Sequence, residues 1–354
     1  MKVTGYETWV ARVPYEEGRF GTHIVLRLTT DDGLRGIGYV SNLTPWSIKA
    51  QRAAIEAFAE QVIGQDPMQV EAINAKLLYI FTRIQLSGLA NSAAGVVDIA
   101  FWDLKARALG QPLWRLLGAA DNTVPAYASW NLWWNYDLGT LVKHAREHID
   151  RGFRQMKYRL GGVQDAASAV ERTRVLREAV GDEIELLTDV NWSWSVNQAI
   201  EIGRALQPYR LFWLEDPISA HDYDGLARVN AEVQMRVAAG EVYHEAPQFT
   251  RLLENRCIDA LIVDLEVGGI TQWLKIAALA EAYRIPVASH TCTEVGAHLV
   301  AAVRNGLTVE YLPWAEPLFK EVPPVKDGRL LLSDRPGVGL DLDEAALKRF
   351  AYNL

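Results

Sequence analysis

The chain has 354 residues, a formal net charge of −8 and 49% hydrophobic residues, and its length allows more than one domain. The acidic charge argues against nucleic acid as a partner, because nucleic-acid-binding domains present a basic surface. No apolar run approaches the length that spans a bilayer, and the N-terminus has no apolar signal segment, so we expect no membrane partner. The two cysteines predict reduced thiols in a cytoplasmic protein without a disulfide framework.

The first part of the chain alternates apolar and polar residues and then changes to helical patterns. The expected antiparallel strands cover Val3–Val13, Gly21–Thr29 and Gly36–Val40, with a hairpin turn at Asp32-Gly33. The expected helices cover Ser47–Ile63, Met68–Ile80 and Ala90–Leu109. Strands followed by helices, without alternation, are typical of an α+β domain, which we place at residues 1–120.

From Val124 onward, strand-like and helix-like segments alternate. Eight short apolar runs follow one another: VPAYAS, FRQMKYRL, IELLTDV, RLFWLED, MRVAAGE, DALIVDL, IPVASH and LTVEYL. Amphipathic segments with helix composition lie between most of them, for example Ala166–Val180 and Val196–Leu206. Eight strands joined by crossover helices favour a closed TIM barrel over an open doubly wound sheet. We place this barrel at residues 121–316 and expect residues 317–354 to return across the first domain.

Three carboxylates close three successive apolar runs at equal intervals. Asp189 ends ELLTD, Glu215 ends LFWLE and Glu241 ends VAAGE, and the intervals from 189 to 215 and from 215 to 241 are 26 residues each. This interval fits one strand, one loop and one helix, so the carboxylates would share the C-terminal rim of the barrel, where TIM-barrel active sites lie. Clustered carboxylates need a cation to remain ionised, and oxygen ligands suit a hard divalent ion such as Mg²⁺.

Other ionisable residues occupy the remaining predicted strands. Lys157 and Arg159 are two positions apart and would face the same side of a strand, as site residues or as an interior salt-bridge pair. Asp264 ends the sixth run and His290 ends the seventh, again 26 residues later. A carboxylate on a neighbouring strand can hold an imidazole in one tautomer and raise its basicity. Glu310 in the eighth run would lie on the opposite wall.

Several residues near the predicted rim are weaker candidates for substrate binding. Trp134 and its aromatic neighbours in SWNLWW could stack on a sugar, or they could pack against the first domain or an oligomer partner. Asn191 could contact the substrate or only cap a strand end, and His244 could contact the substrate or be a solvated loop histidine. His144 and His148 are four residues apart on an outer helix, where we expect a solvated face.

In order and spacing, these motifs resemble the mandelate racemase subgroup of the enolase superfamily, over nearly the whole chain. AAGVVDIAFWDLKARALGQPLWRLLG is similar to the capping-domain helix and its exit, and TDVN, WLEDP and AAGE are similar to the metal-ligand strands. The resemblance implies an α+β capping domain, completed by the chain's end, over a modified (β/α)₇β TIM barrel. It also implies one Mg²⁺ per active site, held by Asp189, Glu215 and Glu241, and a homo-oligomer.

The resemblance further implies a small carboxylate substrate whose α-proton is removed. Lys157 would add positive charge at the substrate carboxylate, and His290 with Asp264 would be the base. Glu310 could help only as a protonated hydrogen-bond donor, which burial near other anions favours. The capping-domain loops at residues 15–20 and 41–46 would determine specificity, with Arg19 as the partner of a distal carboxylate or hydroxyl.

Arg159 departs from the Lys-x-Lys pair that is usual in this family. Arginine, with a pKa above about 12, is a poor proton acceptor, so a racemase with two opposed bases is disfavoured. A single His290 could remove the α-proton and return it to a leaving β-hydroxyl, as in the subgroup's acid-sugar dehydratases. The alternatives are a racemase, an epimerase or a cycloisomerase of the same family, and a catalytically silent binding barrel. The sequence does not identify the sugar acid.

Overall fold

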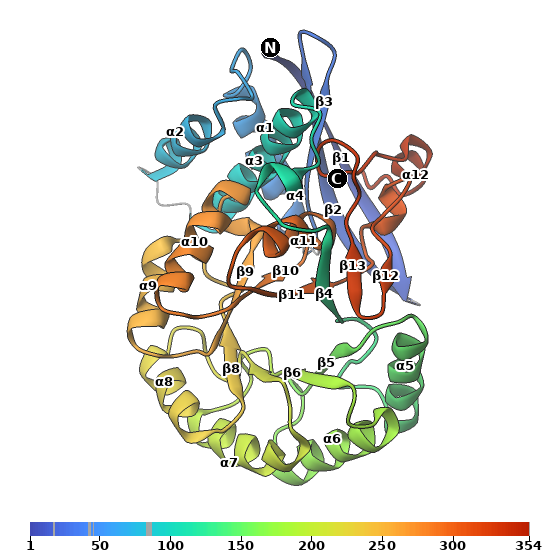
Figure 1. The fold of residues 1–354 in the computed structure, drawn as a ribbon, viewed down its shortest axis with the longest axis vertical. Coiled ribbons are helices and arrows are strands. Elements are labelled where there is room, and N and C mark those ends of the chain that lie inside the picture. The colour runs from blue at the N-terminus through green and yellow to red at the C-terminus, as the bar shows by residue number, and fades with distance from the viewer. Residues whose placement is uncertain (17, 42–43, 45, 83–86, 354) are drawn as a thin grey trace.

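The computed structural model describes residues 1–16, 18–41, 44, 46–82 and 87–353. The loops at residues 15–20 and 41–46 therefore lie partly outside the described residues. A cap made from both ends of the chain stands above a barrel (Figure 1). No helix among the described residues is long and apolar enough to cross a membrane.

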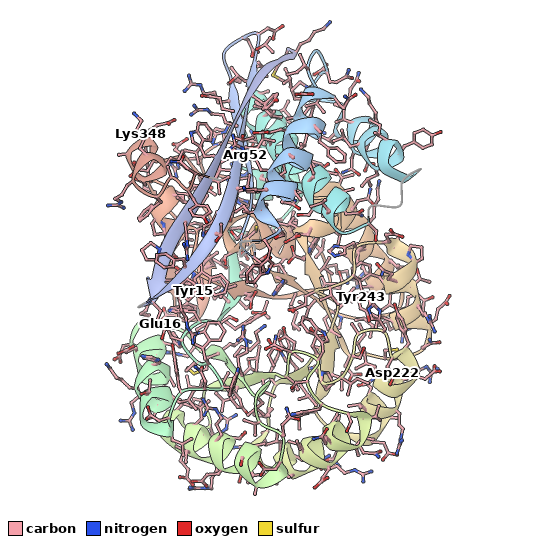
Figure 2. All side chains as sticks on the ribbon, turned by 180° about the vertical axis from the view of Figure 1, so that it is seen from behind. Tyr15, Glu16, Arg52, Asp222, Tyr243 and Lys348 are labelled. Carbon is pink, nitrogen blue, oxygen red and sulfur yellow. The ribbon has the colours of Figure 1, made fainter. Side chains whose placement is uncertain are left out.

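The cap is built on a three-stranded antiparallel sheet, as the alternating pattern predicts. Its strands are β1 (Val3–Glu16), β2 (Arg19–Thr30) and β3 (Arg35–Val40). Its helices are α1 (Ile48–Glu60), α2 (Val70–Thr82) and α3 (Leu89–Ala108). The first two strands pair as far as Glu16↔Arg19, which extends both beyond the predicted ends. This extension brings the end of the hairpin down to the barrel (Figure 2).

Helix α3 is held between the cap sheet and the barrel. A Cβ atom on Gly38 of β3 would lie 1.9 Å from the carbonyl oxygen of Val96, so only glycine allows this approach. On the barrel side, a Cβ atom on Gly95 would lie 2.6 Å from the carbonyl oxygen of Leu265. The backbone N–H of Thr271 also donates to Asp98 Oδ2 at 2.9 Å. These contacts fix the cap on the rim of the barrel.

The barrel has eight parallel strands, and the pairing of β11 with β4 closes it. The strands are β4 (Thr123–Ala128), β5 (Gln155–Arg159), β6 (Glu185–Asp189), β7 (Trp213–Glu215), β8 (Arg236–Ala239), β9 (Ala260–Asp264), β10 (Val287–His290) and β11 (Gly306–Tyr311). The helices between them are α5 (Leu138–Asp150), α6 (Ala166–Val180), α7 (Val196–Leu206), α8 (Tyr223–Glu232), α9 (Ala246–Glu254), α10 (Ile270–Ala282) and α11 (Thr293–Ala302). This order confirms the predicted (β/α)₇β fold class.

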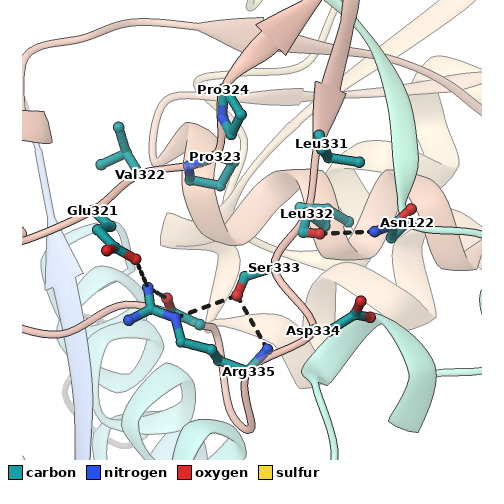
Figure 3. Close-up of a pocket in the computed structure, with 11 residues that line it drawn as sticks. Asn122, Glu321, Val322, Pro323, Pro324, Leu331, Leu332, Ser333, Asp334 and Arg335 are labelled. Atoms are coloured by element: carbon teal, nitrogen blue, oxygen red, sulfur yellow. Dashed lines mark hydrogen bonds and ion pairs between the residues drawn. The ribbon is translucent and has the colours of Figure 1, made fainter.

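The C-terminal segment contacts the barrel before it reaches the cap. The hairpin of β12 (Val325–Lys326) and β13 (Arg329–Leu331) adds antiparallel to β4. Beside it lies a surface pocket lined by Pro323, Leu332 and Arg335, among others (Figure 3). After α12 (Glu344–Arg349), Ala351 bridges to Ala11 of β1.

The close approach of α3 to the barrel gives a first prediction. Gly95→Ala would place a methyl group against the Leu265 carbonyl, and we expect it to reduce the free energy of unfolding by about 1–3 kcal/mol. Chemical denaturation measures this change. Gly5→Ala is the matched control, because nothing lies within 4 Å of its Cβ position. Equal stability of the two variants would contradict the close packing of cap and barrel.

Candidate active site

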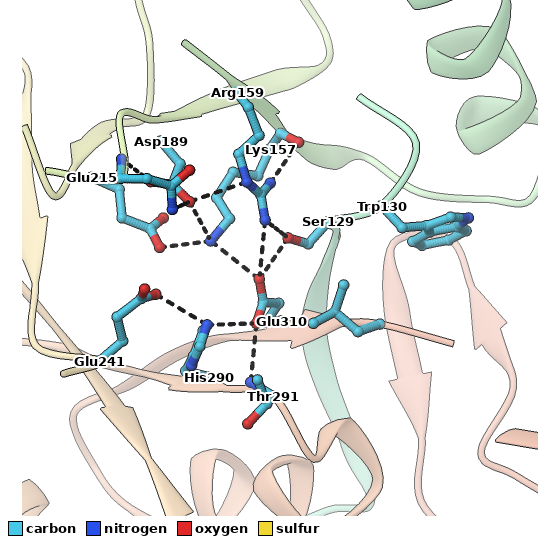
Figure 4. Close-up of polar contacts among 12 residues, drawn as sticks. Ser129, Trp130, Lys157, Arg159, Asp189, Glu215, Glu241, His290, Thr291 and Glu310 are labelled. Atoms are coloured by element: carbon cyan, nitrogen blue, oxygen red, sulfur yellow. Dashed lines mark hydrogen bonds and ion pairs between the residues drawn. The ribbon is translucent and has the colours of Figure 1, made fainter. Parts of the chain in front are cut away.

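The ionisable residues at the strand ends converge at one rim of the barrel (Figure 4). Register explains this convergence: Arg159 on β5 pairs with Asp189 on β6, and Asp189 pairs with Glu215 on β7. Across the barrel, Asp264 on β9 pairs with His290 on β10. The other members of the group lie on β5, just after β8 and on β11; they are Lys157, Glu241 and Glu310.

Lys157 is the central cation of this group. Its side chain is fully buried, and Nζ lies 2.6 Å from Glu215 Oε1, 3.1 Å from Glu310 Oε1 and 3.7 Å from Asp189 Oδ2. Burial opposes its charge, but Glu215 and Glu310 outweigh burial and raise the pKa of Lys157 well above its ordinary value. The ring centroid of Tyr127 lies 5.4 Å from Nζ. Lys157 is therefore a fixed positive charge.

Arg159 is held in place by three neighbours. Its Nε lies 3.1 Å from Asp189 Oδ2, and its Nη2 donates to Ser129 Oγ at 3.1 Å. Its guanidinium lies 5.1 Å from the centroid of the Trp133 ring. Burial opposes its charge, but Asp189 and the other carboxylates outweigh burial and raise the pKa of Arg159. This side chain therefore remains cationic.

His290 is the imidazole of the group, the side-chain type whose ordinary pKa lies closest to neutral pH. Its Nδ1 lies 2.7 Å from Asp264 Oδ2, so the other ring nitrogen, Nε2, faces the remaining carboxylates. Nε2 lies 3.0 Å from Glu241 and 3.5 Å from Glu310. Burial lowers the pKa of His290, but Glu241, Glu310 and the hydrogen bond to Asp264 raise it well above its ordinary value.

The neighbours of Glu310 in this arrangement oppose the protonated form, and its role as a protonated donor in catalysis stays a prediction. Burial alone would raise its pKa, but Lys157, His290 and Arg159 hold the pKa far below its ordinary value. Its Oε1 accepts from Ser129 Oγ at 2.5 Å, and its Oε2 accepts from the backbone N–H of Thr291 at 3.0 Å. Glu310 is therefore an acceptor here, because cations surround it more closely than anions do.

An apolar layer closes the barrel below the charged groups. It contains Tyr127, Leu187, Trp213, Ala238, Ala260, Ile262 and Ala288. The indole Nε1 of Trp213 donates to Glu215 Oε2 at 2.9 Å, so the layer also orients that carboxylate. Because this floor excludes water, charge interactions in the site are stronger than at the surface.

Several residues next to the strand ends adopt backbone angles that are unusual for side-chain-bearing residues. Asn191, Asp216 and Thr291 have φ values of 49°, 42° and 46°. Each follows a strand end of the site by one or two positions. Left-handed residues other than glycine are strained and concentrate at functional sites. The backbone at this rim is therefore held in shape by the surrounding contacts.

Asp189, Glu215 and Glu241 could hold a metal ion, because they offer oxygen ligands on three neighbouring strands. Burial raises the pKa of Glu215 to about 8 despite Lys157, and it also raises the pKa of Glu241. The carboxyl groups of the site outnumber its cationic groups, and a divalent cation would offset that excess. Among the described residues, no group of three His, Cys, Asp or Glu side chains is arranged as a finished metal site. Glu215 contacts Lys157 instead, and Glu241 contacts His290.

The structure places the four weaker candidates for substrate binding in different surroundings. Asn191 donates its backbone N–H and its side-chain amide to Asp189, at 2.9 and 3.3 Å, as a strand-end cap does. Trp134 is 49% exposed, and its ring covers Gly162. His244 lies near Gly88 of the cap, its ring about 3.5 Å from the Cβ position of that glycine. Arg19 stands at the cap hairpin, 3.4 Å from Glu16.

Sequence reasoning did not identify two residues that contact the site. Ser129 connects Arg159 to Glu310, but nothing in VPAYAS or SWNLWW distinguished this serine from its neighbours. Trp133 contacts Arg159, but its position in SWNLWW did not distinguish it from its neighbours. The expectation of a solvated face for His144 and His148 was wrong, because both rings hydrogen-bond to carbonyl oxygens of this loop.

Comparison with known proteins identifies the family. The description "Mandelate racemase / muconate lactonizing enzyme, N-terminal domain" matches residues 16–118, and "Enolase C-terminal domain-like" matches residues 140–346. The chain belongs to the mandelate racemase/muconate lactonizing enzyme family of the enolase superfamily.

Individual relatives include two kinds of sugar-acid enzyme. The chain is 33% identical to L-talarate/galactarate dehydratase from Salmonella typhimurium, over 91% of this chain and 81% of that protein. It is also 33% identical to 3,6-anhydro-alpha-L-galactonate cycloisomerase from Streptomyces coelicolor, over 93% and 91%. A crystal structure of the Salmonella dehydratase with Mg and L-lyxarohydroxamate has a TM-score of 0.93 at 30% identity and covers 99% of this chain and 93% of that chain.

The role of Lys157 as a structural counter-charge gives a second prediction. Lys157→Met would leave Glu215 and Glu310 buried without their nearest cation, and we expect a loss of about 3–5 kcal/mol in the free energy of unfolding. Urea denaturation without added metal measures it. The control is Lys143→Met, whose side chain is 73% exposed beside Glu147 and should change stability by less than about 1 kcal/mol. Similar losses in both variants would contradict the assignment.

Proposed function

We propose that the protein is a lyase, a Mg²⁺-dependent dehydratase that removes water from an acid sugar, either an aldonate or an aldarate. The observation that carries this proposal is that the site pairs one hydrogen-bonded base, His290 with Asp264, with a permanently cationic Arg159 on the opposite wall. The names of the relatives support the same class of reaction, since an L-talarate/galactarate dehydratase, a D-gluconate dehydratase and a D-galactonate dehydratase family member are among them.

Asp189, Glu215 and Glu241 would hold the Mg²⁺, in accordance with their oxygen ligands and excess charge. When bound, the ion supplies positive charge next to the substrate carboxylate and so makes the α-proton more acidic. Lys157 adds a second, permanent charge from β5, where the surrounding carboxylates already fix its position. These groups act together because the α-proton of a carboxylate is only weakly acidic.

His290 would remove the α-proton through Nε2, since Nδ1 is occupied by Asp264. The Cα–H electron pair becomes the Cα–Cβ double bond, and the bond between Cβ and its hydroxyl breaks. The same imidazole returns the proton to the leaving hydroxyl, which departs as water. The enol product then tautomerises to a 2-keto-3-deoxy acid. Asp264 would act by keeping the imidazole in the tautomer that has Nε2 free.

Arg159 decides between one-base and two-base chemistry. A racemase needs proton transfer on both faces of the α-carbon, and the wall opposite His290 would have to supply the second base. Arg159 remains protonated, because its pKa is raised by Asp189 and the other carboxylates. Its contacts with Asp189 and Ser129 suit a residue that positions a metal ligand and Glu310.

A cycloisomerase is the second candidate, because one relative at 33% identity has that name and the reaction also needs a single base. The first step would be the same. The two functions differ in the product: a cycloisomerase product has the mass of its substrate, whereas a dehydratase product has lost water. Mass spectrometry of the product separates them.

Deuterium exchange tests the proposed base. Sugar acids incubated with enzyme and Mg²⁺ in D₂O should lose their α-proton signal in NMR spectra and yield a 2-keto-3-deoxy acid. We expect His290→Asn to reduce both rates by about 10²-fold or more, because a positioned general base contributes about 10²–10⁴-fold. His221→Asn, in an exposed loop, is the matched control and should keep both rates.

Two results would contradict the proposal. Exchange that survives in His290→Asn would mean that Lys157 or Arg159 acts as a base. The absence of a 2-keto acid from any aldonate or aldarate, in the presence of Mg²⁺, would count against dehydration itself.

A further inference from the structure

The proposed function leaves the far end of the substrate without a partner. We infer that this end is an uncharged polyhydroxyl group that lies against an aromatic wall formed by Trp133, Trp314 and Tyr15. The preferred substrates are then aldonates, with one carboxylate, rather than aldarates, with two. This inference rests on the proposed function and extends it from a reaction to a substrate class.

Trp133 lies at the boundary between the charged site and the cap. Its ring centroid is 5.1 Å from the Cζ atom of Arg159, which contacts Asp189 in the site. The same centroid is 5.9 Å from the Cζ atom of Arg19, at the start of cap strand β2. A substrate that extends from the site toward the cap would therefore pass this ring.

Two more rings continue the wall from Trp133 to the cap. The ring centroids of Trp133 and Trp314 are 6.4 Å apart with an interplanar angle of 22°, and those of Trp314 and Tyr15 are 5.1 Å apart at 29°. Trp314 follows β11 of the barrel, whereas Tyr15 belongs to β1 of the cap. Figure 2 shows Tyr15 and Glu16 at the end of the cap sheet that meets the barrel. The wall is therefore complete only when cap and barrel are together.

The loop that carries Trp133 is fixed by hydrogen bonds from the outer helices. Arg172 of α6 donates to the carbonyl oxygen of Trp133 at 2.6 Å. His144 and His148 of α5 contact the carbonyl oxygens of Asn131 and Trp130 at 2.8 and 2.9 Å. A ring held in this way loses little conformational entropy when a ligand binds, so the wall is preorganised.

The wall has free hydrogen-bonding groups that match hydroxyls. Three buried polar atoms have no hydrogen-bond partner among the described residues: the indole nitrogens of Trp133 and Trp314 and the side-chain oxygen of Asn131. Trp314 is only 6% exposed. Buried donors and acceptors are normally satisfied, so these atoms indicate a ligand with hydroxyl groups. The ring faces suit the C–H groups of a sugar chain, because their electrostatic potential is negative.

The charges at the cap end argue against a second carboxylate. Among the described residues, Arg19 is the cation at the cap end of the wall, and its Nη1 lies 3.4 Å from Glu16 Oε2. Glu16 also accepts a hydrogen bond from the hydroxyl of Tyr136 and so remains beside the wall. A second substrate carboxylate would meet Glu16 as well as Arg19, and the two charges offset each other. A neutral polyol has no such conflict.

Binding and kinetics with the Mg²⁺-loaded full chain test the inference. The probes are two pairs of sugar acids that differ only at the far end of the chain: D-gluconate with D-glucarate, and D-galactonate with D-galactarate. Calorimetry should show the better aldonate binding about tenfold or more tightly than its aldarate partner. Trp133→Leu should raise Kd and KM for that aldonate about tenfold, with kcat within about threefold, because it removes the ring next to the site, and Trp314→Leu should act in the same direction because it removes the ring stacked behind Trp133.

Tyr79→Leu is the control, since this ring is 67% exposed on helix α2 of the cap and is not part of the site. It should leave Kd and KM within about twofold. Trp133→Phe keeps a ring but removes the indole N–H, and an intermediate rise in KM separates a binding role from a folding defect.

Tighter binding of aldarates, or equal effects of Trp133→Leu and Tyr79→Leu, would overturn the inference. The proposed function fails separately. The aldonates could bind with the expected preference, and lose it in Trp133→Leu, but give no 2-keto acid. That result would support the role of the aromatic wall and contradict the proposed dehydration.

Discussion

Buried negative charge at one barrel rim is the constraint on which the rest of the site depends. The carboxyl groups on β6, β7, β9 and β11 and after β8 are almost fully buried at this rim. Lys157 and Arg159 offset part of their charge, and each is fixed by the carboxylates that it neutralises. The remaining excess favours a divalent cation. The same balance keeps Arg159 protonated, which the proposed one-base mechanism requires.

The fold supplies this arrangement through repetition and then protects it with the cap. Each βα unit returns the chain to the same rim, so residues that are 26 positions apart become neighbours in register. The cap is attached to that rim by helix α3, whose glycine at position 95 permits a backbone-to-backbone approach. The extended β1–β2 hairpin reaches the other side of the rim and brings Tyr15 and Arg19 to the barrel.

Sequence reasoning could predict the features that depend on local periodicity. The strand ends with Asp189, Glu215, Asp264 and His290 were found because βα spacing is regular and a strand end has a fixed position in a barrel. The cations that lie around Glu310 could not be predicted, because they depend on which of its neighbours are closest in space. Trp133 could not be separated from the residues beside it, because the loop path sets which ring faces Arg159.

The central claim is that Asp189, Glu215 and Glu241 form the binding site of a divalent cation. Titration calorimetry of the metal-free protein with Mg²⁺, repeated with Glu215→Gln, tests it most directly. We predict saturable binding by the unmodified chain, with a matching rise in thermal stability, and binding at least about tenfold weaker in Glu215→Gln. If the unmodified chain does not bind Mg²⁺, or if Glu215→Gln binds it equally well, the claim is contradicted.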